Sequence, residues 1–165
     1  MKRIVCDTGP LLHLREADSL DIVEALGSVA IPPMVYSELI GLDLFWREEK
    51  PAWVNITALD SSSSEASLRW MQAGLLDPGE AQALALALQI TADWLLTDDA
   101  AARLVAQQHG LEVHGSLGVI LWGAATGHLL QAEAEKSLEA LSRSSLWISA
   151  RILEEARTAL RQIFS

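Results

Sequence analysis

Hydrophobic residues form short runs along the chain, separated by longer segments in which they recur every three or four residues. The runs predict buried strands at residues 3–7, Val29–Ile31, Asp93–Thr97 and Leu111–His114. The intervening periodicity predicts helices. Strands that alternate with helices are typical of an α/β protein with a mostly parallel sheet.

The predicted helices fill most of the chain between the strands. Their expected ranges are Pro10–Ala17, Leu20–Leu26, Pro33 to Gly41, Glu65–Ala73, Glu80–Gln89, Ala100–His109, Ser116 to Gly127, and roughly 131–142 and 149–163. Asp18 or Ser19 is expected to cap the second helix, and Ser61–Ser64 the fourth. Residues 42–60 are predicted to be a loop with a short extended piece at Trp53–Ile56.

The last predicted helix carries an apolar stripe of Ile152, Leu153, Ala156, Leu160 and Ile163. A stripe of this kind must pack against another surface, which is either the core of the same chain or an interface. Since the chain has 165 residues and no visible linker, we expect a single domain over residues 1–165. Residues 131–165 form its C-terminal extension or interface.

The lengths of the apolar runs exclude a membrane span, which takes roughly 20 residues. The N-terminal run stops at Asp7 and is too short for the core of a signal peptide. We therefore expect a cytoplasmic protein without membrane contact. The single cysteine, Cys6, agrees with that location and is interpreted as a small buried strand residue rather than a nucleophile.

The net charge of the chain limits the classes of function that the protein could have. The formal net charge is −10, which argues against a nucleic-acid binder that works through basic patches. An acidic balance is compatible with carboxylates that gather around a metal ion. The four histidines have no ligand spacing and are interpreted as surface or loop residues; they are His13, His109, His114 and His128.

Several acids are predicted to converge at one edge of the sheet. Asp7 ends the first strand, and Asp98 with Asp99 ends another. In a parallel sheet these strand ends lie on the same edge. Glu80 begins a helix that is apolar on most sides, and Glu38 lies inside an apolar helical stretch. Carboxylates that meet in this way favour Mg²⁺ or Mn²⁺.

Each of these acids also has a purely structural interpretation. Asp7, Asp98 and Asp99 are able to cap the helices that follow them. Glu80 complements a helix dipole, and Glu38 is compatible with a solvated helix surface. The combination of all five, rather than any single one, indicates a site.

Four segments together resemble the PIN domain, and more closely the small prokaryotic PIN-like proteins related to VapC toxins. They are Asp-Thr-Gly-Pro-Leu-Leu from Asp7, Ile-Pro-Pro-Met-Val-Tyr-Ser-Glu-Leu from Ile31, Asp-Pro-Gly-Glu-Ala-Gln-Ala-Leu from Asp77, and Leu-Leu-Thr-Asp-Asp-Ala-Ala-Ala-Arg from Leu95. The resemblance covers about residues 3–127 and continues more loosely to the end. It implies a three-layer α/β/α sandwich with four to five strands and a ribonuclease dependent on Mg²⁺ or Mn²⁺. It also implies a homodimer and, for toxins, a small antitoxin partner.

The resemblance implies roles for individual residues. The catalytic acids are Asp7, Glu38, Glu80, Asp98 and Asp99, and all but Asp98 are metal ligands. The family pattern Thr-x-Asp points to Asp99 and leaves Asp98 as a second acid beside it. Glu80 stands where many family members have Asp.

Two polar residues are added as substrate-binding candidates. Thr8 follows the first acid, and its hydroxyl is suited to a ligand or water. Arg103 lies one helical turn after Asp99, where it is suited to a phosphate or to an ordinary salt bridge.

Three other classes fit parts of the sequence. Asp7-Thr8-Gly9 is also the triplet of aspartic proteases, but those need two copies in an all-β chain, and this chain has one copy and is rich in helix. Phosphotransfer enzymes also place Asp at strand ends, but the haloacid-dehalogenase pattern needs a second Asp where Gly9 stands. A catalytically inactive protein-binding scaffold is favoured by the surplus negative charge and opposed by the intact acids.

Overall fold

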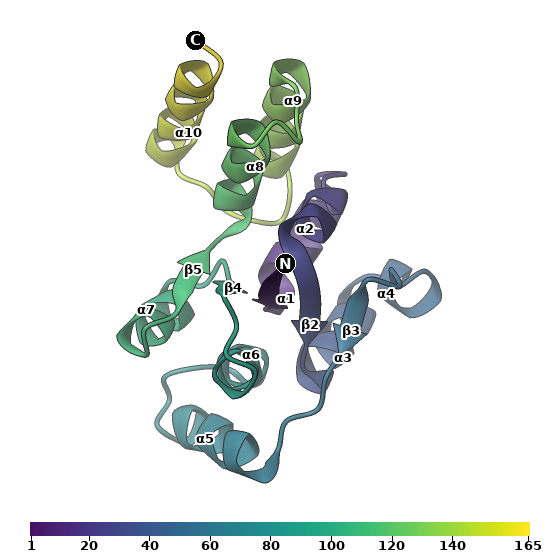
Figure 1. The fold of residues 1–165 in the computed structure, drawn as a ribbon, viewed down its shortest axis with the longest axis vertical. Coiled ribbons are helices and arrows are strands. Elements are labelled where there is room, and N and C mark those ends of the chain that lie inside the picture. Colours follow the sequence, from purple (N-terminus) through teal and green to yellow (C-terminus); the bar gives the residue numbers. More distant parts are fainter.

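A five-stranded parallel sheet forms the centre of the protein, which a computed structural model describes over residues 1–165 (Figure 1). The strands are β1 (Lys2–Cys6), β2 (Gly27–Ile31), β3 (Val54–Ile56), β4 (Trp94–Leu96) and β5 (Glu112–His114), in the order β3-β2-β1-β4-β5. Every neighbouring pair is parallel. The chain builds outward from β1 to β3 and then returns to β4 on the other side of β1. The strand order therefore reverses between β1 and β4, the position where open α/β sheets bind ligands.

Ten helices surround the sheet. They are α1 (Thr8–Glu16), α2 (Asp21–Leu26), α3 (Pro33–Leu42), α4 (Phe45–Glu48), α5 (Ser61–Gln72), α6 (Pro78–Gln89), α7 (Ala100–Gln108), α8 (Ser116–Ala125), α9 (Gln131–Ser142) and α10 (Ala150–Ile163). Helix α6 packs on β1 and β4, α2 on β2, and α7 and α8 on β5. The predicted three-layer α/β/α arrangement with a parallel sheet is confirmed.

Burial explains why β1 and α6 occupy the centre. Ile4, Val5 and Cys6 of β1 are completely buried. Helix α6 is built almost entirely from Ala and Leu, and most of its residues are buried because α3, α5 and the sheet cover it. Burial raises the pKa of the Cys6 thiol, and the nearby charge of Asp7 adds to the effect. Cys6 is therefore a neutral packing residue, as predicted.

Three local predictions were wrong. The segment 42–60 contains β3 as expected but also the short helix α4, where Trp46 is completely buried and Phe45 meets its ring edge-on. Helix α5 begins at Ser61 rather than Glu65, because Asp60 caps it by accepting a 2.7 Å hydrogen bond from the Ser63 N–H.

Neither Asp18 nor Ser19 caps α2, the third wrong prediction. The N-cap residue is Leu20, and no side chain bonds to the helix end. The Ser19 hydroxyl instead donates to the carbonyl of Ala17 and bonds with Ser137 of α9. The Ser19 hydroxyl thus contacts a distant helix instead of capping α2.

The C-terminal helices carry a small core of their own. It joins Ala124 of α8, Ala134 and Leu138 of α9, and Ala156 and Leu160 of α10. The apolar stripe on α10 therefore packs mainly inside the chain, against α8 and α9. In Figure 1 these three helices form the upper part of the molecule. None of the helices has the length and apolar character needed to cross a membrane.

Candidate active site

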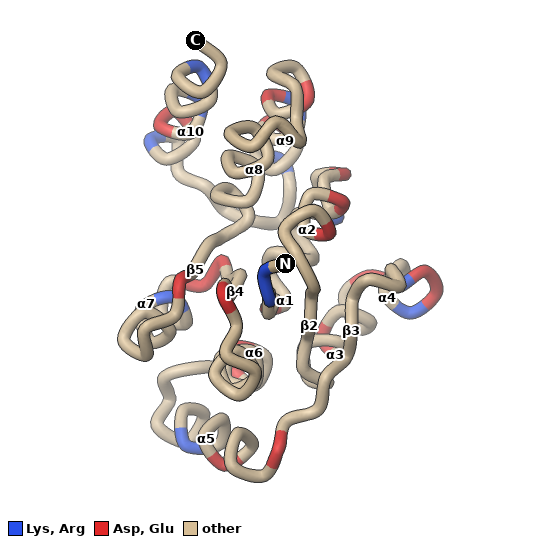
Figure 2. The backbone as a smooth tube through the Cα atoms, viewed as in Figure 1, with Lys and Arg blue, Asp and Glu red and all other residues tan.

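A cleft of about 640 Å³ lies beyond the carboxyl ends of β1 and β4. All five predicted acids line it, namely Asp7, Glu38, Glu80, Asp98 and Asp99, and so does Asp77. No Lys or Arg lines it. Lys and Arg are instead dispersed over the N-terminus and several helices, including α5, α7 and α10 (Figure 2). The prediction that a parallel sheet gathers these acids at one edge is confirmed.

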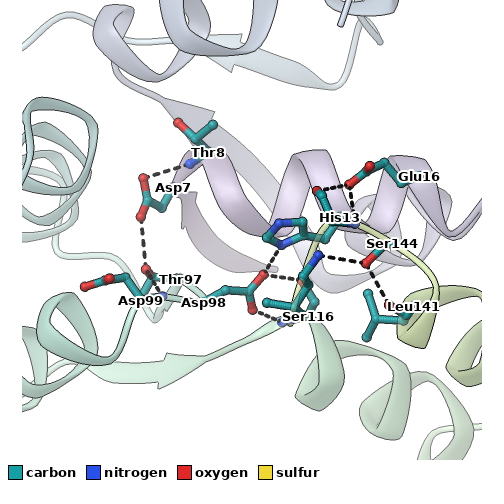
Figure 3. Close-up of polar contacts among 12 residues, drawn as sticks. Asp7, Thr8, His13, Glu16, Thr97, Asp98, Asp99, Ser116, Leu141 and Ser144 are labelled. Atoms are coloured by element: carbon teal, nitrogen blue, oxygen red, sulfur yellow. Dashed lines mark hydrogen bonds and ion pairs between the residues drawn. The ribbon is translucent and has the colours of Figure 1, made fainter. Parts of the chain in front are cut away.

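Asp7 is the most buried of these acids, with 5% of its surface exposed. It follows β1 directly and is the N-cap of α1, where its Oδ1 accepts a 2.7 Å hydrogen bond from the Thr8 N–H. Its Oδ2 accepts a 3.0 Å hydrogen bond from the hydroxyl of Thr97 (Figure 3). The Thr97 oxygen in turn accepts from the Asp99 N–H at 3.2 Å. Thr97 therefore fixes Asp7 relative to the acid at the end of the neighbouring strand.

Glu38 reaches the cleft from α3. Its carboxylate accepts a hydrogen bond from the Thr8 hydroxyl and lies against Gly79 in the first turn of α6. A Cβ atom at Gly79 would lie 2.6 Å from Glu38 Oε1, so a larger residue there would force the end of the Glu38 side chain to move. The proton of the Thr8 hydroxyl is thus already used. Thr8 therefore contacts Glu38 inside the cleft, and its predicted role in substrate binding stays a prediction.

Glu80 and Asp77 form a capping box at the start of α6. Asp77 Oδ1 accepts from the Glu80 N–H at 2.9 Å, and Glu80 Oε2 accepts from the Asp77 N–H at 3.0 Å. Glu80 therefore interacts with the dipole of α6 at its N-terminal end, as predicted, and also lines the cleft. Asp77 was missed as a site residue, although the spacing Asp-x-x-Glu before an apolar helix is a recognisable signal for this pair.

Asp99 caps α7 and keeps one oxygen free of protein hydrogen bonds. Its Oδ2 accepts from the Ala102 N–H at 2.8 Å, and no protein donor bonds to Oδ1. The structural and functional interpretations of Asp99 are again compatible.

Asp98 is fully engaged with protein groups. Its Oδ1 accepts from the Ser116 N–H at 2.7 Å, and its Oδ2 contacts the Ser116 hydroxyl at 2.6 Å and His13 Nδ1 at 2.7 Å (Figure 3). Burial by itself would raise the pKa of Asp98, but the hydrogen bonds from His13 and Ser116 outweigh it and lower that pKa. Asp98 therefore connects the end of β4 with α1 and α8 through hydrogen bonds on both carboxylate oxygens, and its predicted catalytic role stays a prediction.

The interpretation of His13 as a surface or loop residue is wrong. It lies in α1, lines the acidic cleft, and has a side chain that is only 13% exposed. No sequence signal marked it, because its partner Asp98 is 85 residues away. Of the other histidines, His109 and His128 are exposed, and His114 lies half-buried in β5 against the ring of Trp94.

Arg103 does not enter the cleft and forms no salt bridge with any acid. Its Nη2 donates to the carbonyl of Thr97 at 3.3 Å. It lines a neighbouring groove of about 610 Å³, whose wall includes Trp147 with 83% of its surface exposed. Asp98 and Leu146 line both the groove and the cleft.

Two cleft acids hold protons unusually tightly. Burial raises the pKa of Asp7 to about 7, and the negative charges of Asp77 and Glu38 add to this, against the hydrogen bonds from Thr8 and Thr97. Burial likewise raises the pKa of Glu80 to about 8, with Asp77, Asp99 and Asp7 as repelling neighbours. A nearby cation would stabilise the ionised form of these two carboxylates and lower their pKa values.

The carboxylates of the cleft are spread along its walls. No group of three or more His, Cys, Asp or Glu side chains lies close enough together to enclose a divalent metal ion. The chemistry of the cleft nevertheless fits a divalent metal ion, because it offers carboxylate oxygens, lacks Lys and Arg, and raises the pKa of two of its acids.

Fold and cleft together define an α/β/α protein with a carboxylate-rich site at the switch point of a parallel sheet. A family model described as a PIN domain matches residues 3–162. The chain therefore belongs to the PIN domain family. PIN domains are generally nucleases, and those nucleases typically use divalent metal ions. A comparison with curated proteins gave no match.

Proposed function

We propose that this PIN domain is a metal-dependent endoribonuclease. The observation that carries the proposal is a cleft lined by six carboxylates and no Lys or Arg. A phosphodiester is itself anionic, so such a cleft repels it unless cations neutralise the acids. This argument favours a metal-dependent reaction over catalysis by the acids alone.

Asp7, Glu38, Glu80 and Asp99 are proposed as ligands of Mg²⁺ or Mn²⁺. A bound divalent ion lowers the pKa of its water and neutralises charge on the phosphate. The protein's own contribution is to hold the carboxylates in place before the ion binds. Thr97 does this for Asp7, and Thr8 with Gly79 does it for Glu38.

The groove beside the cleft is proposed to bind the RNA that flanks the cleaved bond. Arg103 is its only Lys or Arg and is suited to a phosphate, and the exposed ring of Trp147 is suited to stacking on a base. The choice of RNA over DNA rests on the family resemblance. The same resemblance supports a cytoplasmic homodimer that acts as the toxin of a toxin–antitoxin pair and binds a small antitoxin protein.

The test is cleavage of a labelled, mixed-sequence single-stranded RNA with Mn²⁺, Mg²⁺ or EDTA. Wild type is expected to cut internally only with metal, and Asp7→Asn is expected to be inactive. Asp21→Asn is the matched control, because Asp21 is an exposed acid on α2 outside the cleft. The same assay on DNA of the same sequence tests the preference for RNA.

The main alternative is an inactive PIN-like module that binds a protein. It shares the fold but needs no metal. Absence of cleavage, together with no effect of Mn²⁺ on thermal melting, would contradict the nuclease and support this alternative.

A further inference from the structure

His13 is the only imidazole in the acidic cleft. It lies in the middle of α1, and its side chain is 13% exposed while it lines the same space as the six carboxylates. Neither the metal ligands nor the substrate groove proposed above gives it a role.

The ring orientation of His13 is fixed through Asp98. The carboxylate of Asp98 receives the Ser116 N–H on Oδ1 and the Ser116 hydroxyl on Oδ2, and Ser116 is completely buried at the start of α8. The 2.7 Å contact from His13 Nδ1 reaches the same Oδ2. A carboxylate only accepts hydrogen bonds, so Nδ1 carries the proton of the neutral ring.

The second ring nitrogen is left free. Nε2 of His13 has no hydrogen bond to any protein group, and it is not among the buried polar atoms that lack a partner. It is therefore accessible from the cleft that the ring lines. With the proton on Nδ1, Nε2 presents a lone pair. A carboxylate that orients an imidazole in this way is the arrangement used by histidine bases in acyl transfer.

The geometry points to His13 as the general base of the reaction, a conclusion that rests on the proposed nuclease function. A water molecule attacks the phosphorus, and as its oxygen forms the new bond, one of its protons passes to His13 Nε2. The bond from phosphorus to the leaving oxygen breaks, and that oxygen keeps the electron pair and takes a proton from solvent. His13 then releases its proton to solvent, so the net reaction consumes one water per bond cut. Asp98 and Ser116 are positioning residues that act through His13.

Kinetics of His13→Asn provide the first test. Asparagine is able to donate from Nδ2 to Asp98 as Nδ1 does, but it has no counterpart of Nε2. We expect cleavage to fall by about 10²-fold or more, with affinity for a non-cleavable RNA in Mn²⁺ and melting temperature close to wild type. His128→Asn, an exposed histidine in the turn after α8, is the matched control and is expected to stay within threefold.

Chemical rescue separates a base from a structural residue. Added imidazole is expected to restore part of the activity of His13→Gly and to leave His128→Gly unchanged. A side chain needed only for packing would show no such rescue. Activity of His13→Asn within threefold of wild type would overturn the inference while leaving the nuclease itself intact.

The tautomer provides a test that does not depend on activity. Long-range ¹H–¹⁵N spectra of the metal-free protein distinguish the two neutral forms, and the His13 signal is assigned by its loss in His13→Asn. We expect the Nδ1-protonated form in wild type and its loss in Asp98→Asn. Observation of the Nε2-protonated form would overturn the inference. Lack of RNA cleavage by wild type with any divalent metal would remove the proposed function and this step together.

Discussion

The hydroxyl of Thr97 donates a 3.0 Å hydrogen bond to Asp7 Oδ2 and joins the ends of the two central strands, β1 and β4. Both residues are buried, at 0% and 5% exposure. The same hydroxyl oxygen accepts the Asp99 N–H, so a single buried side chain sets the spacing of two proposed metal ligands. Changes to this one contact are expected to affect both stability and metal affinity.

Replacement of Thr97 by Val tests that relationship. Val has nearly the same shape but cannot donate to Asp7 or accept from Asp99. Leaving these buried polar groups without a partner is expected to lower the free energy of unfolding by about 1–3 kcal/mol at pH 8. Urea denaturation measures the change, and Thr97→Ser is the control that keeps the hydroxyl. Equal stability of the Val and Ser variants would contradict the expectation.

The raised pKa values of Asp7 and Glu80 predict how stability depends on pH without metal. Their folded-state pKa values, about 7 and about 8, exceed the ordinary values of 3.8 and 4.5. The folded protein therefore binds more protons than the unfolded chain between about pH 4 and 8, and stability falls as pH rises through that window. Asp98 has a lowered pKa, so its contribution is lost only in more acidic solution.

Asp7→Asn isolates the contribution of Asp7. In EDTA, wild type is expected to lose on the order of 2–4 kcal/mol through Asp7 between pH 4 and pH 8. The variant is expected to lose less and to melt at a higher temperature than wild type at pH 8. Calorimetry across this pH range measures both effects. If the stability of the two proteins changed equally with pH, the ionisation of Asp7 would not be the source of the pH dependence.

Bound metal is expected to make wild type melt at a higher temperature than Asp7→Asn, the reverse of the order in EDTA. Saturation at 100 times the dissociation constant stabilises a folded protein by about 2.7 kcal/mol, which corresponds to a rise in Tm of roughly 5–10 °C for a domain of this size. We expect this rise with Mn²⁺ for wild type and for Asp21→Asn, and little or none for Asp7→Asn. Differential scanning fluorimetry with Mn²⁺ and with K⁺ at equal ionic strength provides the measurement.

Gly79→Ala tests the packing of Glu38 on α6. An added methyl group collides with the Glu38 carboxylate, and because the end of this flexible side chain is able to move away, we expect a destabilisation of only about 1 kcal/mol. The variant is also expected to bind Mn²⁺ more weakly, because Glu38 must move. In a Glu38→Ala background the same change is expected to be neutral or stabilising.

Gly41→Ala is the matched control for this pair. Gly41 is also helical, but a Cβ atom there has open space, and alanine is expected to stabilise α3 by roughly 0.5–1 kcal/mol. If both glycine variants behaved alike in urea denaturation, the close contact between Gly79 and Glu38 would have no energetic effect.

Arg103→Ala tests the proposed substrate groove. Loss of one phosphate contact is expected to weaken binding of a non-cleavable single-stranded RNA in Mn²⁺ and to reduce the slope of log K against log salt by about 0.7. Arg151→Ala, at an exposed position on α10, is the control and is expected to keep the wild-type slope. Fluorescence anisotropy at several salt concentrations measures both slopes. An unchanged slope for Arg103→Ala would remove Arg103 from the RNA path.

Local sequence patterns were enough to predict the parallel α/β fold and the convergence of the acids. Both follow from local rules, since an apolar run before Asp7 or Asp98 makes a buried strand with an acid at its end. Parallel strands then bring those ends to one edge. The helix α4 and the cap of α5 were missed because a short helix and a single cap residue produce a weak local signal.

The contacts that each side chain makes at that edge depend on how distant elements pack together. The pairs Thr8–Glu38, Thr97–Asp7 and His13–Asp98 span 30, 90 and 85 residues. The hydrophobic periodicity of the sequence indicates which face of a helix or strand is apolar. It does not indicate which side chain of a distant element contacts a polar residue on that face. The position of Arg103 outside the acidic cleft and of His13 inside it was therefore fixed only when α1, α7 and α8 packed around the ends of β1 and β4.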